Sequence, residues 1–180
     1  TQKSQDVYWN QSLSWLFVQQ KEYGKAFVQE KAVYKRNPES FYNIVTLARL
    51  AIEEKQNKDA NTILTFVLEN TQDLELQMQA HHFLLSMEIE SASQKEYATI
   101  DLKLQELLKK YGINPYSLDL QILSAHIKTF YLNQSKLGIE LLQNSLKLPL
   151  NVREQSKVKM ELADILVYDE KFNQAILYYA

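Results

Sequence analysis

The chain has 180 residues, 46% of them hydrophobic and including eleven tyrosines and seven phenylalanines, so it has ample apolar material for a folded core. Its formal net charge is −2 and its basic residues form no cluster, which argues against nucleic acid as a partner, because such binding rests on several contacts between basic side chains and phosphates. No apolar run approaches the roughly 20 residues that cross a bilayer, which argues against membrane insertion, and the absence of cysteine excludes disulfides and cysteine-ligated zinc.

Apolar residues recur at steps of three and four along the chain, which is the period of an α-helix and not of a strand. Only three glycines and three prolines are present, and both residues break helices. We therefore expect an all-α protein whose short connections make neighbouring helices antiparallel. The sequence predicts ten helices, near residues 5–20, 23–36, 39–55, 58–70, 73–91, 94–111, 116–132, 135–147, 151–168 and 171–180.

The few helix-breaking residues fall where these helices should begin or end. Asn37-Pro38 and Asn114-Pro115 each place a capping asparagine before a proline at the first helical position, where the missing N–H costs nothing. Gly112 follows an apolar run as a C-cap glycine would.

Two further segments have the pattern of a capping box, in which the first and fourth residues satisfy each other's backbone N–H groups. Ser93 and Glu96 form one such pair, and Asn151 and Glu154 form the other. Both patterns predict a helix start at that point.

A small residue recurs in the second helix of each expected helical hairpin. Successive members of this set are 34, 38, 40 and 37 residues apart. The set is Ala26, Ala60, Ala98, Gly138 and Ala175. The chain would then consist of five hairpins, at about 5–37, 38–71, 73–112, 114–148 and 151–180, of which the last is incomplete.

A period of 34 with a small residue at the helix crossing resembles the tetratricopeptide repeat (TPR). In the first hairpin the matching residues are Leu13, Phe17, Tyr23, Ala26 and Pro38, and in the last they are Leu162, Ala163, Leu166, Phe172, Ala175 and Tyr179. The resemblance implies a right-handed superhelix, a single repeat domain over residues 1–180 and a fragment of a longer bacterial repeat protein. Another helical solenoid and a closed helical bundle are the alternatives, and the register of the third and fourth hairpins stays open.

The resemblance also implies a function, because such repeats usually bind partners in the concave groove lined by the first helix of each hairpin. We expect a non-catalytic scaffold that holds a peptide or a helix of a partner protein, with Tyr8 and Trp15 as aromatic anchors and Arg49 as a group that binds a carboxylate of the partner. The groove positions of the first two hairpins are Tyr8, Gln11, Trp15, Val18, Tyr42, Val45, Arg49 and Ile52.

Two other functions remain open at this point. The same groove could sense a peptide or signal, or the chain could be the helical arm of a larger enzyme or secretion assembly. The C-terminal hairpin is incomplete and has no polar capping helix, which predicts that the repeat array continues or that the chain self-associates there. The chain begins with Thr1 and not with Met, which favours a trimmed or processed protein at an exported, periplasmic or cell-envelope location, although a cytoplasmic location stays open.

The sequence contains no complete set of residues for catalysis or for a cofactor. Adjacent helical residues such as His81 and His82 point about 100° apart and cannot share one metal ion. The three glycines form neither a phosphate loop nor a dinucleotide-binding turn. We therefore expect no enzymatic activity, no metal and no cofactor.

Overall fold

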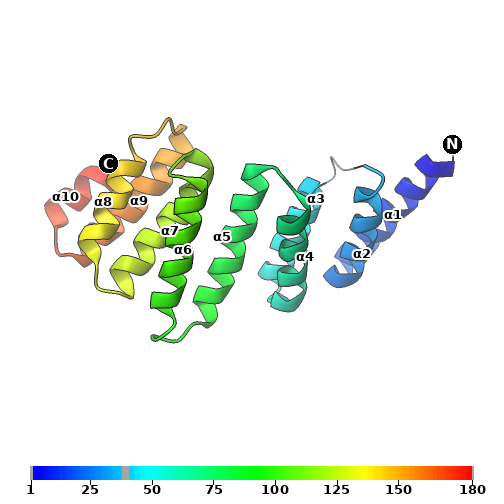
Figure 1. Cartoon of the computed structure of the whole chain (residues 1–180), viewed down its shortest axis with the longest axis horizontal. Helices are drawn as coiled ribbons and strands as arrows, with labels where there is room; N and C mark the ends of the chain where they lie inside the picture. Colours follow the sequence, from blue (N-terminus) through cyan, green and yellow to red (C-terminus); the bar gives the residue numbers. More distant parts are fainter. Residues whose placement is uncertain (1, 38–40, 180) are drawn as a thin grey trace. The chain divides into compact units, whose positions relative to one another are not determined.

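The computed structural model describes residues 2–37 and 41–179, with side chains for residues 6–37 and 43–179. These residues form α-helices and one short 3-10 turn, η2, with no strand in the described ranges (Figure 1). The prediction of an all-helical chain is therefore confirmed, and most predicted helices agree with the observed ones to within a few residues. The helices are α1 (Gln2–Gln19), α2 (Tyr23–Tyr34), α3 (Phe41–Glu53), α4 (Asn57–Asn70), α5 (Leu74–Ser91), α6 (Tyr97–Tyr111), η2 (Pro115–Ser117), α7 (Leu118–Phe130), α8 (Ser135–Ser145), α9 (Val152–Tyr168) and α10 (Phe172–Tyr179).

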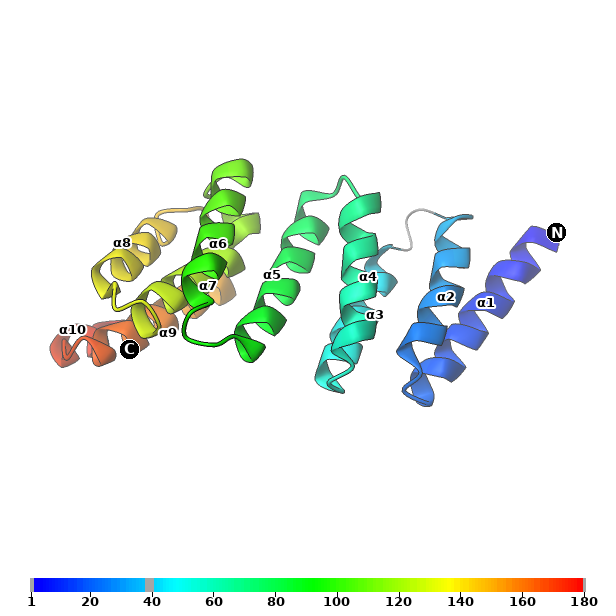
Figure 2. The same cartoon turned by 60° about the horizontal axis from the view of Figure 1, so that its bottom comes forward.

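The chain divides into two compact units, Thr1–Met87 and Glu88–Ala180. In the first unit α1 packs on α2, α2 on α3 and α3 on α4, and in the second α7 packs on α8, α8 on α9 and α9 on α10 (Figure 2). The pairs α1–α2, α3–α4, α7–α8 and α9–α10 are the first, second, fourth and fifth expected hairpins, and the other two contacts join successive hairpins. The boundary lies within α5, so the third expected hairpin, at 73–112, is shared between the two units. A single repeat domain over residues 1–180 stays a prediction.

The turns inside three hairpins share one hydrogen-bond pattern. Lys21, Lys55 and Glu170 have φ of 57°, 59° and 59°, in the left-handed region. The next residue's N–H donates to a carbonyl five positions back, with N···O distances of 2.9, 2.8 and 2.8 Å. This is the Schellman ending of a helix, in which a left-handed residue lets the last turn's carbonyls find donors.

The left-handed turn residues allow the hairpins to be aligned on one another from the backbone alone. The left-handed residue lies five positions before the small residue in each of the three hairpins, and Asn133, with φ of 56°, stands at the same place before Gly138. The third expected hairpin has no such residue before Ala98, because Ser93 lies before a different kind of turn. Its backbone therefore departs from the repeat as its sequence does.

The core of the first unit is an apolar cluster shared by α2, α3 and α4. Ala26, Ala48 and Ala60 are fully buried where the helices cross. Phe27 of α2 packs edge-on against Phe66 of α4, with ring centroids 5.4 Å apart. The small residues permit the close approach that the repeat period implied.

In the second unit the crossing of α7 and α8 is closer still. A Cβ atom on Gly138 would lie 2.5 Å from Thr129 Oγ1 and 2.9 Å from the carbonyl oxygen of Ala125. Both distances are shorter than any that packed carbon and oxygen atoms adopt, so only glycine fits here in the present arrangement. The glycine at this register position is thus explained by the closeness of the two helices.

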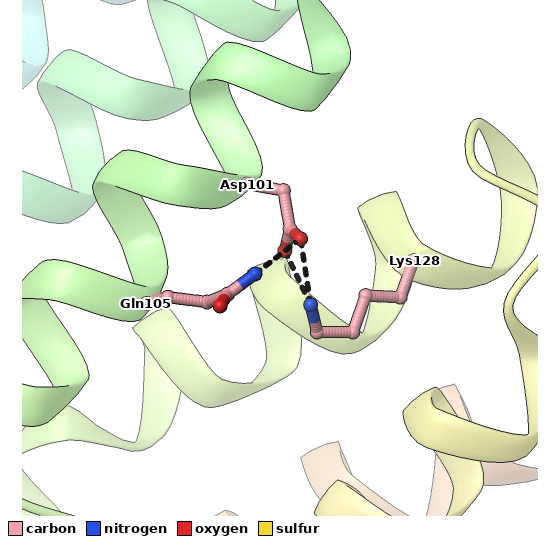
Figure 3. A network of polar contacts seen from close by, with 3 residues as sticks. All are labelled: Asp101, Gln105 and Lys128. Carbon is pink, nitrogen blue, oxygen red and sulfur yellow. Dashed lines mark hydrogen bonds and ion pairs between the residues drawn. The ribbon is translucent and has the colours of Figure 1, made fainter.

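An ion pair is buried between α6 and α7. Lys128 Nζ donates to both carboxylate oxygens of Asp101 at 2.7 Å, and Gln105 Nε2 donates to Asp101 Oδ2 at 2.7 Å (Figure 3). The side chains of Asp101 and Lys128 are only 7% and 12% exposed. Removing one member would leave the other charge without its counter-ion away from water, so the pair fixes how α6 meets α7.

The predicted helix starts are mostly found. Asn151 and Glu154 form a complete capping box, with Asn151 N donating to Glu154 Oε2 at 2.8 Å and Glu154 N donating to Asn151 Oδ1 at 3.0 Å. Asn114 caps η2, which leads directly into α7. Gly112 ends α6 with φ of 83°, as predicted. Pro38 lies outside the described residues.

Ser93 and Glu96 form only one of the two hydrogen bonds of the predicted capping box. Glu96 Oε2 accepts from the backbone N–H of Ser93 at 2.7 Å, and the Ser93 hydroxyl donates to the same carboxylate at 2.5 Å. These two hydrogen bonds hold the pKa of Glu96 below its ordinary value. The hydroxyl therefore donates to the carboxylate and does not cap a backbone N–H, and α6 begins only at Tyr97.

Candidate partner-binding surface

Helix α1 presents an aromatic face. Tyr8 and Trp15, two turns apart, are 65% and 61% exposed. Their side chains line an open hollow of about 470 Å³ together with Gln11, Ser12 and Leu16. Three of the predicted groove residues, Tyr8, Gln11 and Trp15, are therefore close together on one surface.

The chemistry of this face is apolar with a few neutral polar groups. Helix α1 carries no charged residue between Val7 and Gln19. The hollow offers two large aromatic rings, an amide and a hydroxyl. Exposed aromatic rings beside neutral hydrogen-bonding groups suit a peptide backbone and apolar side chains better than a phosphate-rich ligand.

The predicted positions of α3 have different environments. Val45 is buried in the core cluster, so it is not available to a partner and is corrected to a core residue. The reason is that α3 is covered on two sides, by α2 and by α4. Ile52 is half-buried against the same cluster, and the side chain of Tyr42 lies outside the described residues.

Arg49 is the exposed member of the α3 set. Its Nε lies 3.9 Å from Glu53 Oε1, one turn along the same helix, and both side chains are more than half exposed. An ion pair in this setting is worth little, because water screens it. The guanidinium therefore keeps donors for an incoming carboxylate.

Val18 of α1, another predicted groove residue, is half-buried and packs against the core cluster. Ser12 and Leu16 were not predicted, although they line the hollow. Ser12 lies four residues and Leu16 eight residues after Tyr8, so helical spacing from Tyr8 would have found both.

The second unit has a face of another kind on α7 and α9. Lys157 Nζ donates to Asp119 Oδ1 at 2.9 Å, and His126 Nδ1 lies 2.9 Å from Glu161 Oε1. Each of these pairs joins the first helix of one hairpin to the first helix of the next. The polar groups here bind one another, in contrast with the uncharged face of α1.

Two further contacts complete this second face. The ring of Phe130 on α7 lies edge-on to Tyr168 on α9, with centroids 5.0 Å apart. The Tyr179 hydroxyl of α10 donates to Asp164 of α9, and this hydrogen bond raises the pKa of Tyr179. The first contact joins the fourth hairpin to the fifth, and the second joins the two helices of the fifth hairpin.

The described residues contain no group of three or more His, Asp or Glu side chains placed to hold a metal ion. Within the same ranges, no helix is both long and apolar enough to cross a membrane. His126 has Glu161, Phe130 and Tyr131 around it, which is an ordinary interhelical environment.

No protein-family model and no curated protein sequence matches the chain. Solved structures do. The chain is similar to a thermophilic TPR protein of Thermus thermophilus, TTC0263, with a TM-score of 0.58 and 14% identity over 96% of this chain and 88% of that one.

Two other structures are similar to the same extent. MamA 41-end from Desulfovibrio magneticus RS-1 has a TM-score of 0.58 at 13% identity, with 97% of this chain and 91% of that chain covered. PilF of Pseudomonas aeruginosa has a TM-score of 0.59 at 18% identity, with 99% and 76% covered. At such identities the likeness shows the fold alone, and that fold is the TPR-like α-solenoid, an architecture typical of protein-interaction scaffolds.

Proposed function

We propose that the chain is a non-catalytic scaffold that binds an extended peptide or a helix of a partner protein, with the groove side of α1 as its principal contact. The observation that carries the proposal is the pair of exposed rings, Tyr8 and Trp15, over one open hollow in an uncharged stretch of helix. Rigid aromatic side chains of this kind dominate binding energy at protein interfaces. Arg49 adds a carboxylate-binding group on α3.

The ligand chemistry follows from the surface. An apolar side chain, aromatic or aliphatic, fills the hollow between the rings of Tyr8 and Trp15. Gln11 and Ser12 offer hydrogen bonds to the ligand backbone or to a neutral polar side chain. An acidic residue in the ligand pairs with Arg49. The proposed ligand is thus an apolar segment with at least one acidic residue.

The test uses peptides selected from a random displayed library against the immobilised chain. Trp9 and Trp15 are the two tryptophans of the chain, so in a Trp9→Phe variant the emission reports on Trp15 alone. Selected peptides should shift this emission to shorter wavelength as the indole leaves water, and Trp15→Ala or Tyr8→Ala should weaken their affinity by tenfold or more. Arg49→Ala should weaken only the peptides with an acidic residue.

The matched control is Tyr116→Ala, which removes a similarly exposed aromatic ring from the second unit and should leave affinity unchanged. Selected peptides that bind Tyr8→Ala and Trp15→Ala as tightly as the unaltered chain would show that the face of α1 is not the binding surface.

A further inference from the structure

The hollow on α1 has the outline of a hole in a coiled-coil interface. Four of its lining residues stand at positions i, i+3, i+4 and i+7 of one helix, and these are Tyr8, Gln11, Ser12 and Trp15. Residues at these spacings are neighbours on a helix surface and enclose one diamond-shaped space. Where two helices pack in a coiled coil, such a space receives one side chain, called a knob, from the facing helix.

The side chains around this hole are arranged for a large knob. The rings of Tyr8 and Trp15 stand at its two ends, about 10 Å apart along the helix axis. The shorter side chains of Gln11 and Ser12 lie between the rings, and Leu16 extends the apolar wall. The hollow has a volume of about 470 Å³, which exceeds that of any single side chain. A large apolar side chain can therefore enter between the two rings.

This side of a first helix is also open where another hairpin precedes it. The left-handed turn residues align α1 with α9, and α7 and α8 pack on α9. Three of the four equivalent positions on α9 are nevertheless exposed, and the fourth is half-buried. In the order of the hole these positions are Lys157, Met160, Glu161 and Asp164, of which Glu161 is the half-buried one. On α3 the equivalent of Gln11 is Val45, which is buried, so not every first helix has a hole of this kind.

The charges around the hole restrict what can fill it. Only uncharged side chains line it, and α1 has no charged residue between Val7 and Gln19. The knob must therefore be uncharged too, because a buried charge without a partner is costly. Arg49 stands at the register position of Trp15 on α3 and is exposed. A ligand complementary to both features has an apolar row with an acidic residue on its flank.

The backbone of the ligand decides between a helix and an extended peptide. An extended segment across the same distance has about three residues, each with an N–H and a C=O group that need partners. Among the residues that line the hollow, only Gln11 and Ser12 have hydrogen-bonding side chains apart from the hydroxyl of Tyr8 and the indole N–H of Trp15. A helix satisfies its own backbone groups and brings only side chains to the surface. The hollow therefore suits a helix better.

We propose that the partner segment is an amphipathic α-helix that lies along α1 and inserts one large apolar side chain between the rings of Tyr8 and Trp15. Its apolar residues recur at steps of three and four, and an acidic residue on its flank pairs with Arg49. This inference rests on the function proposed above and narrows the ligand from peptides in general to helices.

The experiment uses displayed random peptides of about 18 residues, which is long enough to form a helix when bound. Each peptide selected against the unaltered chain is remade with alanine, and separately with proline, at a position where alanine leaves the affinity unchanged. Proline breaks a helix, so the proline peptide should bind about tenfold more weakly or worse than the alanine peptide. Far-UV circular dichroism of the mixture should show more helix than the sum of the separate spectra.

Two other outcomes separate this inference from the proposed function. Alanine and proline peptides that bind equally without a gain in helix, while Trp15→Ala still weakens both, would mean that the hollow holds an extended peptide. That result would overturn the inference and leave the proposed function standing. Binding that Trp15→Ala does not weaken would overturn both.

A variant of the chain tests the hole directly. Ser12→Leu keeps a good helix former in α1 and fills the space between the rings, so helical peptides should bind it about tenfold more weakly or worse. Ser156→Leu adds the same side chain at an exposed position of α9 and is the matched control, which should leave the affinity unchanged. Equal affinity of a peptide for Ser12→Leu and for the unaltered chain would show that no knob enters the hole.

Discussion

Whether replacing Gly138 by alanine raises or lowers the free energy of unfolding depends on how closely α7 and α8 cross. At an exposed helical site the change would stabilise the protein by about 1 kcal/mol, because alanine is the better helix former. At Gly138 the new methyl group would lie 2.5 Å from Thr129 Oγ1 and 2.9 Å from the Ala125 carbonyl oxygen. The second contact is with backbone, so α8 must move away from α7.

Overpacking of this kind costs roughly 1–3 kcal/mol, so after the helix-propensity gain the net effect of Gly138→Ala should be a loss of up to about 2 kcal/mol in the free energy of unfolding. Urea unfolding followed by circular dichroism measures it. Thr129→Ala in the same chain removes the shorter contact and should restore part of the loss, which a double-mutant cycle would show as a coupling energy. A Gly138→Ala chain that is more stable than the original would refute the close crossing.

Two other changes test features of the backbone and of the buried charges. Lys55→Gly should stabilise the first unit by about 1 kcal/mol, since Lys55 is held at φ of 59°. The control Thr65→Gly, at an exposed site inside α4, should instead destabilise it by roughly 0.5 kcal/mol. Thermal unfolding measures both changes, and equal effects would contradict backbone strain at Lys55. Lys128→Met should lower the free energy of unfolding by roughly 3–5 kcal/mol, because Asp101 is left buried without its partner. In denaturant titrations the double variant Lys128→Met with Asp101→Leu should recover most of that loss. A double variant as unstable as the single one would mean that packing and not charge explains the cost.

The helices and their order could be predicted because the relevant physics is local. Apolar spacing, scarce helix breakers and capping residues such as Asn151 act within a few positions, and the structure agrees with them. The left-handed turns could not be predicted. Lys21, Lys55 and Glu170 carry no turn signal of their own, and their conformation is imposed by the pairing of the helices on either side.

The candidate site was predictable only in part, because exposure depends on neighbours. Tyr8 and Trp15, which the repeat register predicts as groove positions, are exposed on α1, which packs on α2. Gln11 is exposed on the same helix, whereas the equivalent position on α3 is Val45, which is buried because α2 and α4 pack around α3. Whether these residues bind a partner remains a proposal for the peptide experiments above.

The non-glycine turns also bear on the order of events in folding. A lysine or glutamate in the left-handed region costs roughly 1–2 kcal/mol in an isolated segment, so such a turn is a poor nucleus for its own hairpin. We expect the helices joined by Lys21, Lys55 and Glu170 to meet through their apolar side chains before the connecting backbone adopts its final conformation. We therefore expect the folding transition state to contain the interhelical contacts of Ala26 and Ala60 before the turns beside them are formed.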